Sequence, residues 1–179
     1  MEIAVFGGGC FWCTEAIYES LKGVISILPG YAGGEKAYPT YDEVCMGKTG
    51  HAEAIQVEFD PSQISYNDLL TVFFATHDPT TRNRQGNDVG TQYRSIILTT
   101  TEDQKREADA FIQELDFADS SGKPIVTEVK TLDLFYEAED YHKKYYERNA
   151  SQPYCQVVID PKLKKVKEKF AGLMKKTHA

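Results

Sequence analysis

Two cysteines near the start of the chain carry the side chains best suited to chemistry. Cys10 follows three consecutive glycines, and Cys13 completes a Cys-x-x-Cys pair that encloses the single tryptophan, Trp12. The residues before the pair favour a strand and those after it favour a helix, so we expect Cys10 at a helix N-terminus. Unpaired backbone N–H groups there carry partial positive charge, which biases a thiol toward the nucleophilic thiolate.

Several interpretations of this pair compete. The two thiols could be buried structural residues. A zinc site needs two more ligands, and because the sequence has no second Cys-x-x-Cys, zinc is disfavoured. A thiol–disulfide oxidoreductase of the thioredoxin type also places this motif at the start of a helix, although usually after an additional strand and helix. Alternatively, Cys10 acts as a lone nucleophile beside an apolar wall of Phe11 and Trp12. A non-enzymatic interaction domain built around the thiols is the remaining alternative.

The elements that must position Cys10 follow from hydrophobic periodicity. Strands are expected at 1–6, 23–28, 51–59, 93–100, 124–129 and 156–159, and helices at 14–21, 65–74, 101–115, 138–148 and 161–175. The polar stretch 77–92 lacks periodicity, and loops of this length are usually functional or disordered. The connection through the first helix is βαβ-like. We therefore predict an α+β fold: a two-layer sandwich with a mixed β-sheet, flanking helices and long active-site loops.

Length, composition and charge limit the kinds of protein that this chain can be. The 179 residues suffice for one domain, which is expected to span 1–179. The net charge of −7 argues against nucleic-acid binding, and no apolar run reaches transmembrane length, so no membrane partner is expected. Four cysteines without a signal peptide indicate thiols in a reducing compartment. We expect a cytoplasmic protein and a monomer.

Short motifs run in order through most of the chain. They are Gly9-Cys10-Phe11-Trp12, Gly30-Tyr31-Ala32-Gly33-Gly34, Pro39-Thr40-Tyr41, Gly50-His51-Ala52-Glu53, His77-Asp78-Pro79-Thr80, the run from Gly86 to Ser95, and Ala138-Glu139-Asp140-Tyr141-His142. Together they resemble the A-type peptide methionine sulfoxide reductases. The chain departs from the family pattern at Tyr38, where asparagine is usual, and at Cys13, where many members have glycine.

The resemblance implies an oxidoreductase that reduces methionine S-sulfoxide, free or in proteins, and so repairs oxidised protein. Cys10 would attack the electrophilic sulfur, and Glu53 would protonate the departing oxygen. A carboxyl in an apolar pocket keeps its proton to a higher pH, as such an acid requires. The substrate-binding residues implied by the resemblance are Phe11, Trp12, Tyr41, Asp88 and Tyr93.

Each of these residues also has an ordinary structural interpretation. By spacing alone, Glu53 is equally a solvated strand residue. Tyr41 and Tyr93 would be packed tyrosines, and Asp88 a turn-forming residue. The histidines of the motifs, His51, His77 and His142, are expected to be structural or to brace the site.

The first step would leave Cys10 as a sulfenic acid, which a second thiol converts to a disulfide. By resemblance that thiol is Cys155, in a C-terminal segment, and Cys13 is the alternative because it lies one helical turn from Cys10. We predict Cys155 as the principal resolving thiol and Cys45 as a bystander. Thioredoxin would be the external reductant. The sequence shows no cofactor motif, and no metal is expected.

Overall fold

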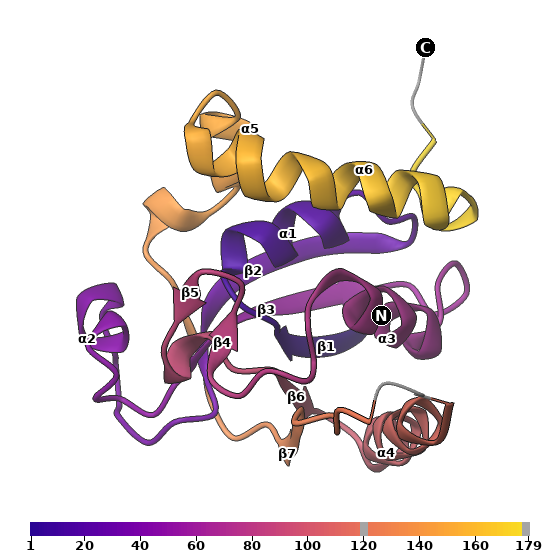
Figure 1. Ribbon diagram of the computed structural model, residues 1–179, viewed down its shortest axis with the longest axis horizontal. Coiled ribbons are helices and arrows are strands. Elements are labelled where there is room, and N and C mark those ends of the chain that lie inside the picture. The colour runs from indigo at the N-terminus through magenta and orange to yellow at the C-terminus, as the bar shows by residue number, and fades with distance from the viewer. Residues whose placement is uncertain (119–121, 177–179) are drawn as a thin grey trace.

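The computed structural model describes residues 1–118 and 122–176 (Figure 1). The strands are β1 (Glu2–Gly7), β2 (Val24–Ala32), β3 (Ala52–Phe59), β4 (Arg84–Gln85), β5 (Asp88–Val89), β6 (Ile96–Thr99), β7 (Glu128–Thr131) and β8 (Phe135–Glu137). The α-helices are α1 (Phe11–Glu19), α2 (Tyr41–Cys45), α3 (Tyr66–Thr76), α4 (Glu102–Ala118), α5 (Tyr145–Asn149) and α6 (Asp160–Lys169). Short 3-10 turns span Thr91–Tyr93, Asp140–His142 and Ala171–Leu173, and a π-helical turn spans Cys155–Ile159.

A six-stranded sheet in the order β7-β6-β1-β3-β2-β8 forms the centre of the fold. β3 pairs antiparallel with both β1 and β2, and β7 adds in parallel to β6. β1 and β2 therefore run in the same direction on either side of β3, which makes β1-α1-β2 a split βαβ unit. The predicted α+β fold with a mixed sheet is confirmed.

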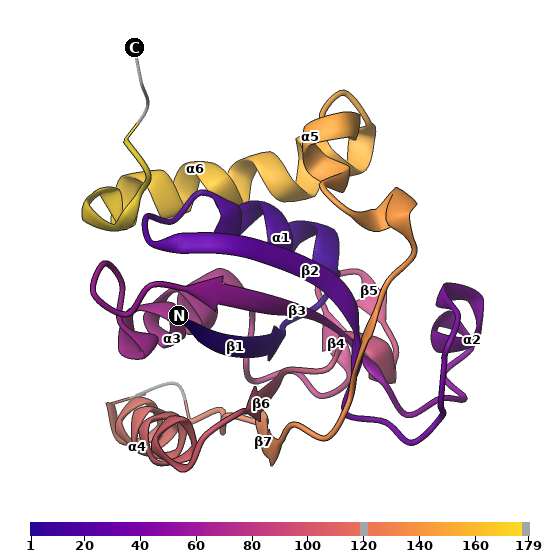
Figure 2. The ribbon, with the colours of Figure 1, turned by 180° about the vertical axis from the view of Figure 1, so that it is seen from behind.

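The two faces of the sheet bury different residues because side chains alternate along each strand. Ala4 and Phe6 of β1 join the larger core with α1 and α3, whereas Val5 lies in a smaller cluster on the opposite face. Figure 1 shows α1 between the sheet and the C-terminal helices α5 and α6. Figure 2 shows the segment between β7 and β8 passing across the other side, where Leu132 packs on the smaller cluster.

The pairing of β1 with β3 places the end of β1, which leads to Cys10, beside the start of β3, which carries Glu53. Phe6 lies opposite Ile55, so the end of β1 and the start of β3 are adjacent. The two backbones approach closely there, since a Cβ on Gly7 would stand 2.9 Å from the carbonyl oxygen of Glu53. This register places the residues after β1 beside Glu53.

The C-terminal segment differs from the prediction. Residues 156–159, expected as a strand from their β-branched content, lie in the π-helical turn that runs directly into α6. The physical reason is burial at helical spacing, because Cys155, Ile159, Leu163 and Val166 all face the core. Tertiary packing thus overrides the local preference for a strand.

Other predicted elements are shorter or displaced. The predicted helix at 138–148 is reduced to a 3-10 turn and α5, because Lys144 adopts the left-handed conformation at φ 51°. Residues 77–92 include the β4–β5 hairpin, and α2 and β8 were not predicted. Ser65 caps α3 through a capping box with Asp68. Tyr38, where the family usually has asparagine, takes φ 51°, a conformation that asparagine adopts more readily.

Candidate active site

Cys10 occupies the N-cap position of α1, directly after the glycine turn that leaves β1. Gly9 has φ +95°, and a Cβ there would lie 2.9 Å from Cγ of Gln85. The turn therefore requires glycine for both its conformation and its close packing. Cys10 is half-buried, whereas Cys13 on the first turn of α1 is 2% exposed.

Cys10 and Cys13 behave as one titrating pair. A hydrogen bond from Cys10 lowers the pKa of Cys13 to about 7. Burial, together with the same bond and the charge of Glu53, raises the pKa of Cys10. The two protons of such a pair are lost in steps whose pKa values belong to the pair and not to one thiol. The proton that remains after the first step can move between the two sulfurs. The thiolate expected at Cys10 therefore forms first at Cys13, which can then accept the proton of Cys10.

Glu53, the second residue of β3, lies next to the helix that carries Cys10. Its Oε1 accepts a hydrogen bond from the backbone N–H of Phe11 at 3.2 Å, and its side chain is 1% exposed. Its other oxygen, Oε2, is buried without a hydrogen-bond partner among the described residues. Burial raises the pKa of Glu53 to about 8, only partly offset by the Phe11 hydrogen bond. The carboxyl therefore holds a proton at neutral pH.

Tyr41 and Tyr93 are both half-buried, and both lie near enough to Glu53 for its charge to act on their hydroxyls. Burial and the charge of Glu53 raise the pKa of both phenols well above their ordinary value, so both remain hydrogen-bond donors. Glu139 positions this region from the 3-10 turn after β8. It accepts hydrogen bonds from the Tyr31 hydroxyl at 2.8 Å and from the backbone N–H of Tyr41 at 3.1 Å. The two predicted phenols therefore lie near the predicted acid.

Trp12 is enclosed by the C-terminal segment. Its Nε1 donates to Nδ1 of His142 at 3.0 Å. The ring of Tyr145 stacks on the indole with centroids 3.7 Å apart and planes within 8°, and Tyr154 makes an edge contact at 5.9 Å. One face of the indole is therefore backed by Tyr145. Phe11, predicted beside Trp12 in the apolar wall, is instead fully buried under Tyr41 and His142.

Asp88 at the start of β5 reaches the thiols through Tyr154. The Tyr154 hydroxyl donates to Oδ2 of Asp88 at 2.9 Å and lies 3.7 Å from Sγ of Cys13. A groove of about 900 Å³ opens beside these groups. Its walls include Cys10, Cys13, Asp88 and Tyr154, together with residues of the β4–β5 hairpin and the start of α6.

The two candidate resolving thiols lie in different surroundings. Cys13 is hydrogen-bonded with Cys10, as the pKa shifts of both indicate. Cys155 is fully buried at the start of the π-helical turn, and burial raises its pKa, with smaller contributions from the charges of Asp160 and Cys13. The charge of Cys13 thus raises the pKa of both Cys10 and Cys155. Cys45 is exposed at the end of α2.

The histidines of the motifs fill structural positions. His51 accepts from the Gly34 N–H at 3.0 Å and bonds the Lys36 carbonyl at 2.7 Å. Burial lowers the pKa of His77 to about 4, and the neutral ring bonds the Phe73 carbonyl and the Ser95 hydroxyl. His142 touches the site directly through Trp12.

Sequence reasoning missed the roles of Glu139, Tyr145 and Tyr154. Glu139 lay within a quoted motif, but nothing in its spacing indicated that it would hold the backbone at Tyr41. Tyr145 and Tyr154 belong to a tyrosine-rich segment whose path over Trp12 depends on the left-handed turn at Lys144. Only that unusual aromatic content distinguished them in the sequence.

Residues 1–118 and 122–176 contain no group of three or more His, Cys, Asp and Glu side chains arranged to hold a metal ion. Within the same ranges, no helix has the length and apolar character needed to cross a membrane.

The comparisons with known proteins agree with this geometry. The family model described as peptide methionine sulfoxide reductase matches residues 2–174. Peptide methionine sulfoxide reductase MsrA of Saccharolobus solfataricus is 55% identical over 175 residues, covering 98% of each chain. The reduced form of Mxr1 from Saccharomyces cerevisiae superposes with a TM-score of 0.80 at 36% identity, covering 86% of this chain and 88% of that one.

A second structure of the yeast protein contains a partner. Mxr1 in complex with Trx2 matches with a TM-score of 0.57 at 26% identity, over 80% of this chain and 84% of that one. A paired thiol, a buried protonated acid and two phenols therefore occur here within a fold and a sequence shared with reductases of this kind. The chain belongs to the peptide methionine sulfoxide reductase family.

Proposed function

We propose that this chain reduces methionine S-sulfoxide, free or in oxidised proteins, to methionine. The observation that carries the proposal is Glu53, a buried carboxyl that keeps its proton at neutral pH and has one oxygen unpartnered among the described residues. An acid of this kind is needed where a sulfoxide oxygen must be protonated as it leaves sulfur. Cys10 at the start of α1 supplies the nucleophile beside it.

In the reductive step, the Cys10 sulfur attacks the sulfoxide sulfur while Glu53 protonates the oxygen. Cys13 holds the proton that Cys10 gives up, and the Tyr41 and Tyr93 hydroxyls donate hydrogen bonds to the oxygen. The attack forms a bond between the two sulfurs, and that bond breaks as the protonated oxygen passes from the substrate sulfur to the Cys10 sulfur. The products are methionine and the Cys10 sulfenic acid, so the substrate sulfur is reduced by two electrons and the Cys10 sulfur is oxidised by two.

The decisive experiment is incubation of the protein with methionine S-sulfoxide and dithiothreitol, followed by detection of methionine. Steady formation of methionine is expected. Reduction of insulin without methionine formation would instead assign the Cys10–Cys13 pair to thiol–disulfide exchange, and bound zinc with neither activity would indicate a metal-binding domain. The R-sulfoxide is the matched control and should remain unreduced.

For the resolving step, we propose a relay that begins at Cys13. The hydrogen-bonded Cys13 thiol condenses with the Cys10 sulfenic acid to form a disulfide and water. Residues i and i+3 at a helix start can meet the Cα separation of about 4.4–6.8 Å that a disulfide needs. Cys155 then attacks the Cys13 sulfur, which releases Cys10 and leaves a Cys13–Cys155 disulfide for the external reductant.

We predict that Cys155→Ser keeps the first turnover and loses most of the thioredoxin-driven steady state, because the final disulfide cannot form. Dithiothreitol should restore turnover in that variant. Peptide mapping of the wild type after one turnover measures the pairing directly. A Cys10–Cys155 disulfide with Cys13 still open to alkylation would contradict the relay and favour direct resolution by Cys155, the thiol preferred from the sequence.

Three further properties belong to the proposal. Thioredoxin is the reductant, which the complex of Mxr1 with Trx2 supports for a related protein. Residues 1–179 act as one domain and as a monomer without a prosthetic group or metal. The protein works in the cytoplasm, where thioredoxin-type reductants keep thiols reduced. Light scattering and a thioredoxin-coupled assay on the metal-stripped protein test these statements.

Trp12→Ala is expected to raise the KM for methionine sulfoxide by about five- to fiftyfold. The indole would contribute an apolar contact to the S-methyl group of about 0.8 kcal/mol and a sulfur–aromatic contact of about 0.3–1.5 kcal/mol. Steady-state kinetics with dithiothreitol measure the change. Unchanged KM and kcat would show that Trp12 serves the core alone.

A further inference from the structure

A second buried carboxyl lies on α1, and sulfoxide reduction as described makes no use of it. Glu15 is 2% exposed, and its Oε2 has no hydrogen-bond partner within 1–118 and 122–176. An unpartnered buried polar atom costs free energy, so such a residue needs an explanation. Glu15 stands one helical turn beyond Trp12 on the helix that carries Cys10.

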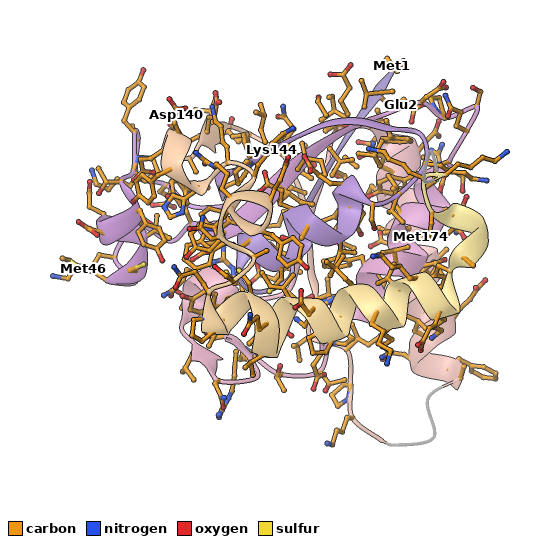
Figure 3. All side chains as sticks on the ribbon, turned by 90° about the horizontal axis from the view of Figure 1, so that it is seen from above. Met1, Glu2, Met46, Asp140, Lys144 and Met174 are labelled. Carbon is orange, nitrogen blue, oxygen red and sulfur yellow. The ribbon has the colours of Figure 1, made fainter. Side chains whose placement is uncertain are left out.

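The carboxyl of Glu15 faces the point where the chain enters α5. Glu15 and Lys144 line the same small cavity, and the backbone amides of Lys144 and Tyr145 lie close enough to the carboxyl to lower its pKa. Lys144 adopts a left-handed conformation with φ 51°, which a long side chain takes only when its surroundings impose it. Figure 3 labels Lys144 at this turn, beside α1. The carboxyl therefore anchors a strained turn to the catalytic helix.

That turn determines where the ring of Tyr145 lies. Tyr145 stacks on Trp12 with ring centroids 3.7 Å apart, and His142 from the same segment accepts the Trp12 indole N–H. A contiguous set of contacts thus connects Glu15, through the Lys144–Tyr145 backbone, to the indole. We propose that Glu15 is a positioning residue for sulfoxide reduction, holding Tyr145 against Trp12 and thereby fixing the wall that receives the S-methyl group.

The effect of Glu15 on catalysis rests on the proposed function. The claim that Glu15 holds Tyr145 against Trp12 does not. Charged and titratable groups face Glu15 from three elements: Glu19 on α1, Lys144, Tyr146 and Glu147 at α5, and Lys167 on α6. Burial raises the pKa of Glu15 to about 7, the two amides lower it in part, and the charge of Glu19 raises it. A carboxylate accepts amide hydrogen bonds more strongly than a carboxylic acid does. The turn is therefore held more tightly above about pH 7.

The experiment uses Trp12 as its own reporter, because it is the single tryptophan of the chain. Emission is recorded from pH 5.5 to pH 8.5 for the wild type, Glu15→Gln, Glu15→Ala and the control Glu147→Gln, which removes an exposed carboxyl of the same cavity. Cys13 and His142 are present in all four proteins, so differences between them report on Glu15. We expect a larger emission change near pH 7 in the wild type and the control than in both Glu15 variants, in which only the contribution of the shared groups remains.

Kinetics with dithiothreitol give the second readout. Glu15→Ala should raise the KM for methionine sulfoxide by about three- to tenfold with kcat within about twofold, the scale of one weakened sulfur–aromatic contact. Glu15→Gln, which retains an acceptor oxygen, should recover most of that loss. Tyr145→Ala, with Glu15 intact, should reproduce the KM change even if Glu15→Ala does not fold.

Two outcomes would overturn the inference. One is a folded Glu15→Gln whose emission titrates as in the wild type, and the other is a Tyr145→Ala with unchanged KM. If the wild type forms no methionine, the proposed function fails, yet the emission titrations still test whether Glu15 controls the position of Tyr145 on Trp12.

Discussion

A Cys10→Ser variant is expected to form no methionine, even in a single turnover at enzyme concentrations equal to the sulfoxide. A serine hydroxyl is a far weaker nucleophile at neutral pH than a thiol whose proton is shared with Cys13. Cys10 sits at the N-cap of α1 with its side chain half-buried, so serine fits without disturbing the helix. Methionine is measured by chromatography after quenching.

Cys45→Ser serves as the matched control for this experiment. Cys45 is exposed at the end of α2, and its thiol takes no part in the proposed relay. The control should retain wild-type single-turnover yield and steady-state rate. Single-turnover methionine formation by Cys10→Ser above the enzyme-free background would remove Cys10 from the mechanism.

Glu53→Gln is expected to slow the reductive step by about 10²- to 10⁴-fold, the usual contribution of a positioned general acid. Glutamine keeps the size of the side chain and the acceptor for the Phe11 N–H but has no transferable proton. The measurement is the single-turnover rate with excess enzyme. A rate within threefold of the wild type would show that the proton comes from another donor.

The rate of the reductive step in the wild type should have a rising and a falling limb as pH increases. The rate rises near pH 7 as the Cys10–Cys13 pair loses its first proton, and it falls as pH increases through about 8, where Glu53 loses its proton. Glu53→Gln should keep the first limb and lose the second. A falling limb that persists in the variant would assign it to another group.

The raised pKa of Glu53 also predicts that the stability of the folded chain depends on pH. The pKa of Glu53 is about 8 in the folded chain against an ordinary 4.5, so between these values the folded state binds the extra proton. Stability therefore decreases as pH rises through this window, because the free energy of unfolding falls where the folded state holds more protons. Glu53→Gln should lose less stability than the wild type between pH 5 and pH 9, as urea unfolding would measure.

The placement of Cys10 could be predicted because it depends on local pattern. A short alternating strand, a glycine turn and a helical stretch lie next to one another in the sequence, and β1 and α1 follow that pattern. Glu53 could not be placed by spacing alone. Its burial depends on the register between β1 and β3, which an alternating pattern leaves open to either face of the strand.

The C-terminal segment was the least predictable part. Val157 and Val158 indicated a strand, but the core selects the helical spacing of Cys155 and Ile159. The stacking of Tyr145 on Trp12 and the contact of Tyr154 with Cys13 join residues more than a hundred positions apart. No short-range pattern encodes such contacts, since they depend on how whole layers pack.

The long sequence separations within the site bear on the order of events during folding. Phe11 and Glu53 bond across 42 positions, Trp12 and His142 across 130, and Cys13 and Tyr154 across 141. Contacts of high sequence separation form slowly because a large loop must close first. On a ribosome Cys10 and Cys13 emerge early, whereas Cys155 and the aromatic cover of the indole emerge near the end of synthesis. Catalytic competence is therefore a late product of folding, and until then Cys10 behaves as an ordinary, unpaired thiol of a nascent chain.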